Sequence, residues 1–250
     1  MQYILSIIFQ LLFLAPVGLG QQLQVAVASN FYEPLSKLAE VYNTQHRGNV
    51  KLSPGSTGKL FSQITMGAPF DLFFAADKKH PQMLINSQHA VAKSFWVYGH
   101  GRLVLWKKDS RFRLSAASIS QQGLRFAIAN PKLAPYGQAA QEYLTKVHLW
   151  TKIKPFLIYG SNIGHTFQYA YTDPKTLAFT ALSQMIARDI PSHHYDVISE
   201  EFHTPVEQAS VILTKSRYAT EAIRFMTFMQ GKGALSILAS YGYRDPIGRL

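Results

Sequence analysis

The chain contains 250 residues, of which 47% are hydrophobic and 16% are charged. This composition excludes an intrinsically disordered protein, because such chains are poor in apolar residues and rich in charge. The length fits one large domain or two lobes of roughly 100 residues each. The sequence has no cysteine, which excludes disulfide scaffolds, thiolate metal sites, cysteine nucleophiles and a lipid anchor attached to cysteine.

The net charge is +11, from 25 Lys and Arg residues against 14 Asp and Glu residues. A surface of this kind can attract nucleic acid, anionic lipid or small anions. The basic residues are scattered, however, and adjacent pairs occur only at Lys78-Lys79 and Lys107-Lys108. The pattern therefore favours a generally basic, solvated surface, and we expect no nucleic-acid partner.

Residues 1–20 have the pattern of a secretory signal peptide. The segment 4–14 is almost wholly apolar, and Gly18-Leu19-Gly20 fits a small-x-small cleavage site. The apolar run is shorter than the ~20 residues that a membrane-spanning helix needs, which disfavours the alternative of an uncleaved membrane anchor. We expect a cleaved signal peptide over 1–20.

Strands and helices alternate after the signal peptide. An apolar strand is expected over 23–28, and Asn30 and Glu33 have the spacing of a capping box for the helix that follows. Further strands are expected over 50–53 and 71–75, with a second helix between them. The apolar residues of the first helix recur with the spacing of one helical face, at Leu35, Leu38, Ala39 and Tyr42.

The second half of the chain repeats this alternation. Its expected elements are strands at 96–98, 103–106 and 125–129, a turn at 131–137, a helix at 138–147, strands at 177–181 and 211–213, and C-terminal helices. The order predicts an α/β fold with mixed, mostly parallel sheets. Because no Ser-rich or Gly-rich linker divides the chain, we expect two lobes with a ligand cleft between them. Lobe I is placed at 21–101 plus 214–250, and lobe II at 102–213.

Two strand-to-helix turns are rich in small hydroxyl residues. They are Ala28-Ser29-Asn30 and Gly55-Ser56-Thr57-Gly58. A helix N-terminus has unpaired backbone N–H groups and a partial positive charge, so such turns can bind an oxyanion. The alternative is ordinary helix capping. The second turn is not a phosphate loop, because its glycines are too close together and Leu60 stands where that loop needs Ser or Thr.

No motif for catalysis or for metal binding stands out. The nine histidines are dispersed apart from the adjacent pair His193-His194, and there is no H-E-x-x-H, so we expect no metal site. No G-x-S-x-G occurs, and nothing arranges Ser, His and Asp as a triad. A secreted hydrolase and a nucleic-acid binder stay open as remote alternatives, although each lacks the pattern that it needs.

These motifs resemble those of the periplasmic molybdate-binding proteins, the solute receptors of ABC-type molybdate importers. The resemblance covers essentially all of 22–243 and is most specific over 55–77. It implies a bilobal periplasmic-binding-protein fold that closes on a tetrahedral oxyanion. It also implies a periplasmic monomer that is not an enzyme, with a membrane ABC permease as its partner and no cofactor besides its molybdate or tungstate ligand. The matching segments are 25–30, 55–77, 125–131, 135–137, 177–184 and 241–243.

The resemblance also implies which residues bind the ligand. The three hydroxyl residues would donate from the two turns, and Thr57 lies nearest the family's ligand-contacting serine. Tyr136 and Ile163 fall where the second lobe offers backbone N–H groups to the ligand. The implied set is Ser29, Ser56, Thr57, Tyr136 and Ile163.

One position departs from the family's pattern. A tyrosine whose hydroxyl completes the site in some members is replaced here by Ala181. Molybdate and sulfate are fully ionised near neutral pH, so their site needs only donors, and neutral donors avoid burying an unpaired cation. Apart from Glu33, which has a capping role available, no carboxylate lies in the matching turns. We expect a receptor for molybdate and tungstate, and the nearest alternative is a receptor for sulfate or another oxyanion.

Overall fold

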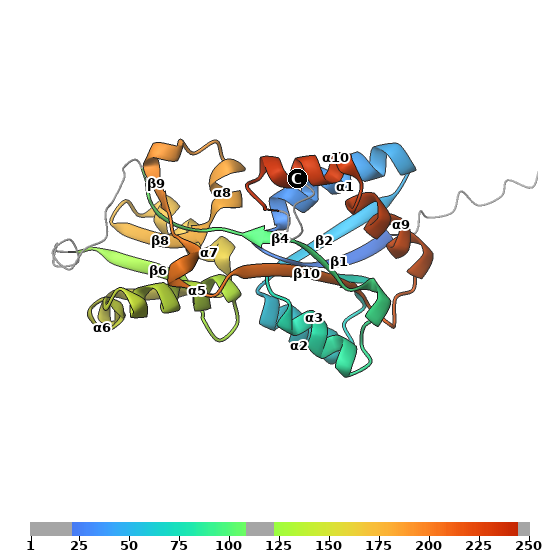
Figure 1. The fold of residues 1–250 in the computed structure, drawn as a ribbon, viewed down its shortest axis with the longest axis horizontal. Coiled ribbons are helices and arrows are strands. Elements are labelled where there is room, and N and C mark those ends of the chain that lie inside the picture. The colour runs from blue at the N-terminus through green and yellow to red at the C-terminus, as the bar shows by residue number, and fades with distance from the viewer. Residues whose placement is uncertain (1–21, 109–122, 245–250) are drawn as a thin grey trace, which may run out of the picture.

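The computed structural model describes residues 22–108 and 123–244. The expected signal peptide lies outside these described residues. Within them the chain forms two five-stranded mixed sheets with helices packed on both faces (Figure 1). The expected two-lobed α/β fold is therefore confirmed. In the described ranges, no helix combines the length and the apolar character needed to cross a membrane.

The first sheet has the strand order β2-β1-β3-β10-β4. Helices α1, α9 and α10 cover one of its faces, and α2 and α3 cover the other. Val25 and Val27 accordingly join one hydrophobic cluster while Ala26 joins the other, because successive side chains of a strand point to opposite faces. The elements are β1 (Gln22–Ala28), α1 (Tyr32–His46), β2 (Asn49–Gly55), α2 (Thr57–Thr65), β3 (Leu72–Ala75), α3 (Lys79–Asn86), β4 (Trp96–Gly101), β10 (Val206–Ile212), α9 (Ala219–Met229) and α10 (Lys232–Ser240).

The second sheet has the strand order β7-β6-β8-β5-β9. Helices α5 and α6 pack on one face, and α7 and α8 pack on the other. Its elements are β5 (Leu103–Lys107), β6 (Arg125–Ala129), α5 (Pro135–Lys146), α6 (Trp150–Ile153), β7 (Leu157–Gly160), α7 (Ile163–Thr172), β8 (Thr176–Ala181), α8 (Leu182–Ile186) and β9 (Tyr195–Val197). Short 3-10 helices occupy Ala92–Ser94, Lys154–Phe156, Ser192–His194 and Glu200–Phe202.

The chain passes between the two sheets twice. It leaves the first sheet at Arg102, between β4 and β5, and returns to it through residues 203–205, before β10. Lobe II was predicted to extend to residue 213. This boundary is wrong, because β10 pairs with β3 and β4 in the first sheet. Only the apolar end of β10 shows in the sequence, since Glu207 and Gln208 interrupt its beginning.

The structure also differs from expectation in the balance of strand pairs and in the cap of the first helix. Parallel pairs do not predominate, because each sheet contains as many antiparallel as parallel pairs among its described strands. The expected capping box is absent from α1, whose N-cap is Phe31 and has no side-chain cap. Asn30 instead donates to Gln208, and Glu33 lies 3.2 Å from the guanidinium of Arg188. Both side chains therefore serve tertiary contacts.

Gly137 lies where the start of α5 approaches the end of β6. A Cβ there would lie 2.0 Å from the carbonyl oxygen of Ala129. We expect Gly137→Ala to shift α5 and lower the free energy of unfolding by about 1–3 kcal/mol. The matched change Gly233→Ala in α10, where a Cβ meets nothing within 4 Å, should be neutral or stabilise by up to about 1 kcal/mol. Urea unfolding of both variants measures the difference, and equal midpoints would contradict it.

Candidate functional site

A small cavity lies between the two lobes at the carboxyl ends of parallel strands. All five residues that the family resemblance implied as ligand-binding line this cavity, so the structure brings them together. Its volume is about 10 Å³, which is about the space that one water molecule needs. The described residues that line it are Ala28, Ser29, Asn30, Gly55, Ser56, Thr57, Ala76, Ala134, Pro135, Tyr136 and Ile163.

Three helices begin at this cavity. Thr57 is the first residue of α2, Tyr136 is the second residue of α5, and Ile163 is the first residue of α7. The first backbone N–H groups of a helix have no partner within it, and the helix dipole places a partial positive charge there. The cavity thus faces three such ends, one from lobe I and two from lobe II.

Ser56 provides a buried hydroxyl that nothing in the described chain uses. The residue is 3% exposed, and its Oγ has no hydrogen-bond partner. Although Ser56 is the N-cap of α2, its side chain does not cap the helix. A buried polar atom left unpaired is unusual in a folded protein and needs an explanation. A ligand in the cavity that accepts hydrogen bonds would provide one.

Thr57 and Ser29 make hydrogen bonds to the chain. Thr57 Oγ1 accepts a hydrogen bond from the backbone N–H of Ala76 at 3.0 Å, which leaves its own hydroxyl hydrogen free to be donated. Ser29 donates from both Oγ and its backbone N–H to the carbonyl oxygen of Gly55, at 3.0 Å each. Both donors of Ser29, which the resemblance assigned to the ligand, are thus used by Gly55, whereas the hydroxyl hydrogens of Ser56 and Thr57 are available.

Two lining residues of the second lobe, Tyr136 and Ile163, lie at the starts of helices. The hydroxyl of Tyr136 accepts a hydrogen bond from Gln208 Nε2 at 3.2 Å, so the side chain is engaged elsewhere. Asn162 caps α7, since its side chain accepts from the backbone N–H of His165 at 3.0 Å. That cap leaves the N–H of Ile163, one residue into the helix, as an unpaired end group.

Asn30 lines the cavity, although the resemblance did not place it among the ligand-binding residues. Its position directly after Ser29 in the same turn was the available signal. Ala181, which stands at the position of the family's tyrosine, is not among the lining residues. Its backbone N–H donates to Gln184 Oε1 at 3.3 Å.

The described residues that line the cavity carry no charge, and charges gather outside it. A groove that shares Ala76 and Pro135 with the cavity is lined by Asp77, Lys78, Lys79, Glu142 and Glu207, among others. The ammonium group of Lys78 pairs with the carboxylate of Glu207 there. Among the described residues, no group of three His, Cys, Asp or Glu side chains is arranged to hold a metal ion.

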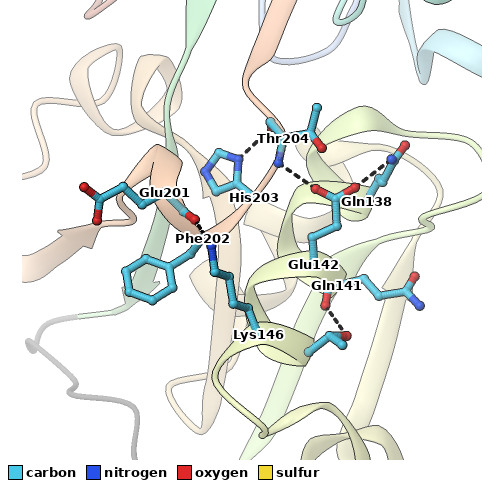
Figure 2. Close-up of a pocket in the computed structure, with 9 residues that line it drawn as sticks. Gln138, Gln141, Glu142, Lys146, Glu201, Phe202, His203 and Thr204 are labelled. Carbon is cyan, nitrogen blue, oxygen red and sulfur yellow. Dashed lines mark hydrogen bonds between the residues drawn. The ribbon is translucent and has the colours of Figure 1, made fainter.

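A wider groove near Glu142 offers a contrast (Figure 2). Glu142 accepts hydrogen bonds of 2.7 Å from the backbone N–H of Thr204 and from Gln138 Nε2. Burial alone would raise the pKa of Glu142, but these hydrogen bonds outweigh it and lower the pKa. The carboxylate is therefore ionised at neutral pH, so this groove places a negative charge beside any anion that enters it.

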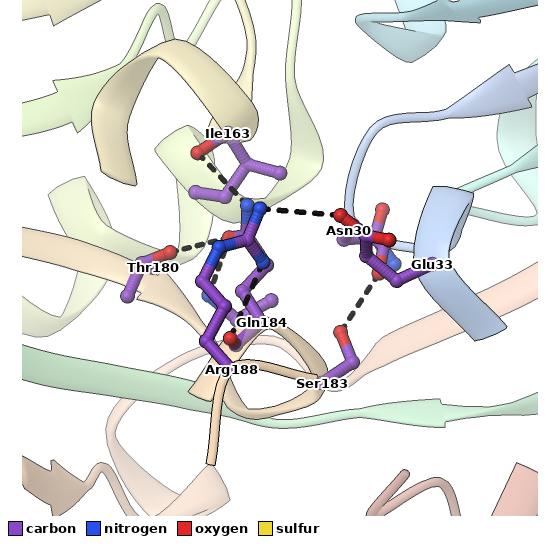
Figure 3. Close-up of polar contacts among 8 residues, drawn as sticks. Asn30, Glu33, Ile163, Thr180, Ser183, Gln184 and Arg188 are labelled. Carbon is purple, nitrogen blue, oxygen red and sulfur yellow. Dashed lines mark hydrogen bonds and ion pairs between the residues drawn. The ribbon is translucent and has the colours of Figure 1, made fainter. Parts of the chain in front are cut away.

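Polar contacts join the lobes beside the cavity (Figure 3). Ser183 in α8 donates from its hydroxyl to the carbonyl oxygen of Asn30 at 2.7 Å. Arg188, which follows α8, pairs with Glu33 of α1 and lies 4.4 Å above the ring of Phe167 in α7. These contacts hold the turn after β1 against the helices of lobe II.

The unpartnered hydroxyl of Ser56 predicts an unusual stability effect. An N-cap Ser or Asn changed to Ala normally costs about 1 kcal/mol. We expect Ser56→Ala to cost less than about 0.5 kcal/mol in the ligand-free protein, because no hydrogen bond is lost. Asn162→Ala, which removes a cap that is used, should show the normal cost. Thermal or urea unfolding separates the two, and an equal loss would show that Ser56 is a structural cap.

Comparison with known proteins identifies the family of this chain. The sequence profile described as "bacterial extracellular solute-binding protein" matches residues 23–244. The chain is 31% identical over 229 residues to the molybdate-binding protein ModA of Rhodobacter capsulatus, covering 91% of this chain and 90% of that protein. It is 33% identical over 233 residues to the molybdate-binding protein ModA of Azotobacter vinelandii, covering 92% of each. The structure of the Azotobacter vinelandii periplasmic molybdate-binding protein matches with a TM-score of 0.83 and 31% identity, over 90% of this chain and 99% of that one. The chain belongs to the bacterial extracellular solute-binding protein family.

Proposed function

We propose that this protein is a periplasmic receptor that binds molybdate, and also tungstate, and delivers the anion to a membrane ABC permease. The observation that carries the proposal is the buried, unpartnered hydroxyl of Ser56 in an uncharged cavity where three helices begin. Two relatives that are more than 30% identical are molybdate-binding proteins, which supports this choice of ligand.

The chemistry of the cavity selects the charge state of the ligand. Its lining offers hydroxyl and backbone N–H donors, and no carboxylate of the described chain lies among them. A fully ionised tetrahedral oxyanion has only acceptors, so every contact can be favourable. A protonated phosphate would bring a donor that needs an acceptor, and an unmet donor in a buried site is costly. Neutral donors also leave no unpaired cation when the site is empty.

The geometry explains how a receptor could bind and release such an anion without catalysing a reaction. Ser29, Ser56 and Thr57 belong to lobe I, whereas Tyr136 and Ile163 belong to lobe II. A ligand bound by both lobes stabilises the state in which they are together, because that state binds it more tightly. A hydrolase is not supported, since no described residue lining the cavity is a His, Asp, Glu or Lys that could act as a general base.

Calorimetric titration of residues 21–250 tests the ligand. We expect one-to-one binding of molybdate and tungstate, weaker binding of sulfate because its smaller size fits less closely, and no binding of phosphate. If sulfate binds tightly and molybdate does not bind, the protein is still an oxyanion receptor, but its ligand is sulfate. If none of the four anions binds, the proposal is overturned.

Ser56→Ala tests the donor that the structure singles out. The loss of one hydrogen bond to a charged ligand should weaken molybdate binding roughly 10- to 100-fold. Ser62→Ala is the matched control, because Ser62 lies further along α2 and donates to the carbonyl oxygen of Gly58 at 3.0 Å, away from the cavity lining. Its affinity should match that of the unchanged protein. Equal affinities for both variants would show that Ser56 does not contact the anion.

A further inference from the structure

A buried hydrogen-bond network lies behind the cavity and centres on Gln208. This side chain, on β10, is 0% exposed. Its Oε1 lies 2.7 Å from Asn30 Nδ2 and 2.9 Å from the hydroxyl of Tyr98, and its Nε2 donates to the hydroxyl of Tyr136 at 3.2 Å. Burial raises the pKa of Tyr98 and of Tyr136 well above the usual tyrosine value, so both hydroxyls stay protonated.

The network connects opposite walls of the cavity. Asn30 lines it from lobe I and Tyr136 lines it from lobe II, and neither uses its side chain for the helix that it precedes or begins. Gln208 lies on the strand that follows the second crossover between the lobes. One amide group therefore joins both walls to the crossover.

Two features of the backbone allow Gln208 to reach the hydroxyl of Tyr136. The pairing of β10 with β4 shifts register between Gln208 and Ala209, and a β-bulge of this kind re-aims a side chain. Gly101 is the last residue of β4. A Cβ on Gly101 would lie 2.0 Å from the Tyr136 hydroxyl and 2.2 Å from Gln208 Nε2. Both the bulge and the missing side chain leave room for this one bond.

We propose that Gln208 is a positioning residue whose bond to the Tyr136 hydroxyl forms when the lobes come together and slows release of the anion. This inference rests on the proposed function of the cavity. The bond crosses from one lobe to the other, so opening the cleft must break it, whereas an anion approaching an open cleft meets no such barrier. Its loss should therefore raise the dissociation rate and leave the association rate unchanged.

The test compares two Tyr→Phe variants of the full mature chain. Tyr136→Phe removes the hydroxyl that bonds to Gln208 and keeps the ring and the backbone N–H. Tyr42 is as little exposed as Tyr136, and Tyr42→Phe removes a hydroxyl that donates to Glu221 at 2.7 Å inside lobe I and away from the cavity. Stopped-flow tryptophan fluorescence with molybdate gives both rate constants, thermal unfolding gives stability, and small-angle scattering without ligand gives the radius of gyration.

We expect Tyr136→Phe to release molybdate roughly 3- to 10-fold faster with an unchanged association rate. Tyr42→Phe should lose stability without a change in either rate. Gly101→Ala, which forces the two groups apart, should act like Tyr136→Phe if it folds. Equal dissociation rates in the two tyrosine variants would overturn the inference and assign the network a structural role.

A failure of the proposed function gives a different result. If the unchanged protein binds none of molybdate, tungstate, sulfate and phosphate, the receptor proposal fails and the rates are undefined. The scattering comparison then decides the inference alone. A larger radius of gyration for Tyr136→Phe than for Tyr42→Phe supports the tie between the lobes, and equal radii overturn it.

Discussion

The meeting of three helix N-termini at one small space is the constraint on which the rest of the molecule depends. The starts of α2, α5 and α7 each bring N–H groups that the helix cannot pair and a partial positive charge. Like partial charges oppose such a meeting, so other contacts must hold it. The bond from Ser183 to Asn30 and the ion pair of Arg188 with Glu33 lie beside the cavity and join the two lobes there.

The distribution of charge follows from the same constraint. A lysine or arginine inside the cavity would bind an anion strongly but would stay buried and unpaired without it. The described lining avoids this cost by relying on hydroxyl and main-chain donors. The charged side chains stand at the margin instead, where Lys78 pairs with Glu207 and His80 lies 2.7 Å from Asp77. The charged side chains of the described ranges thus lie outside the cavity, whose lining is neutral.

Local patterns in the sequence predicted most of the strands and helices, and the family resemblance implied five of the residues that line the cavity. Hydroxyl-rich turns after apolar strands are short-range signals, so Ser29, Ser56 and Thr57 could be found without a structure. The role of Asn30 could not, because its partner Gln208 is 178 residues away and its turn also fits a capping box. The full extent of β10 was missed for a related reason: Glu207 and Gln208 look like loop residues until their pairing with β4 is known.

The backbone contact between Gly58 and Leu133 has a consequence for size discrimination. The N–H of Gly58, in the first turn of α2, donates to the carbonyl oxygen of Leu133 in lobe II at 2.9 Å, and a Cβ on Gly58 would lie 3.1 Å from that oxygen. The two lobes therefore touch through bare main chain directly beside the cavity. Main chain cannot change rotamer to make space, so this contact fixes how closely α2 approaches lobe II. An anion that held the lobes further apart at this point would have to break this bond.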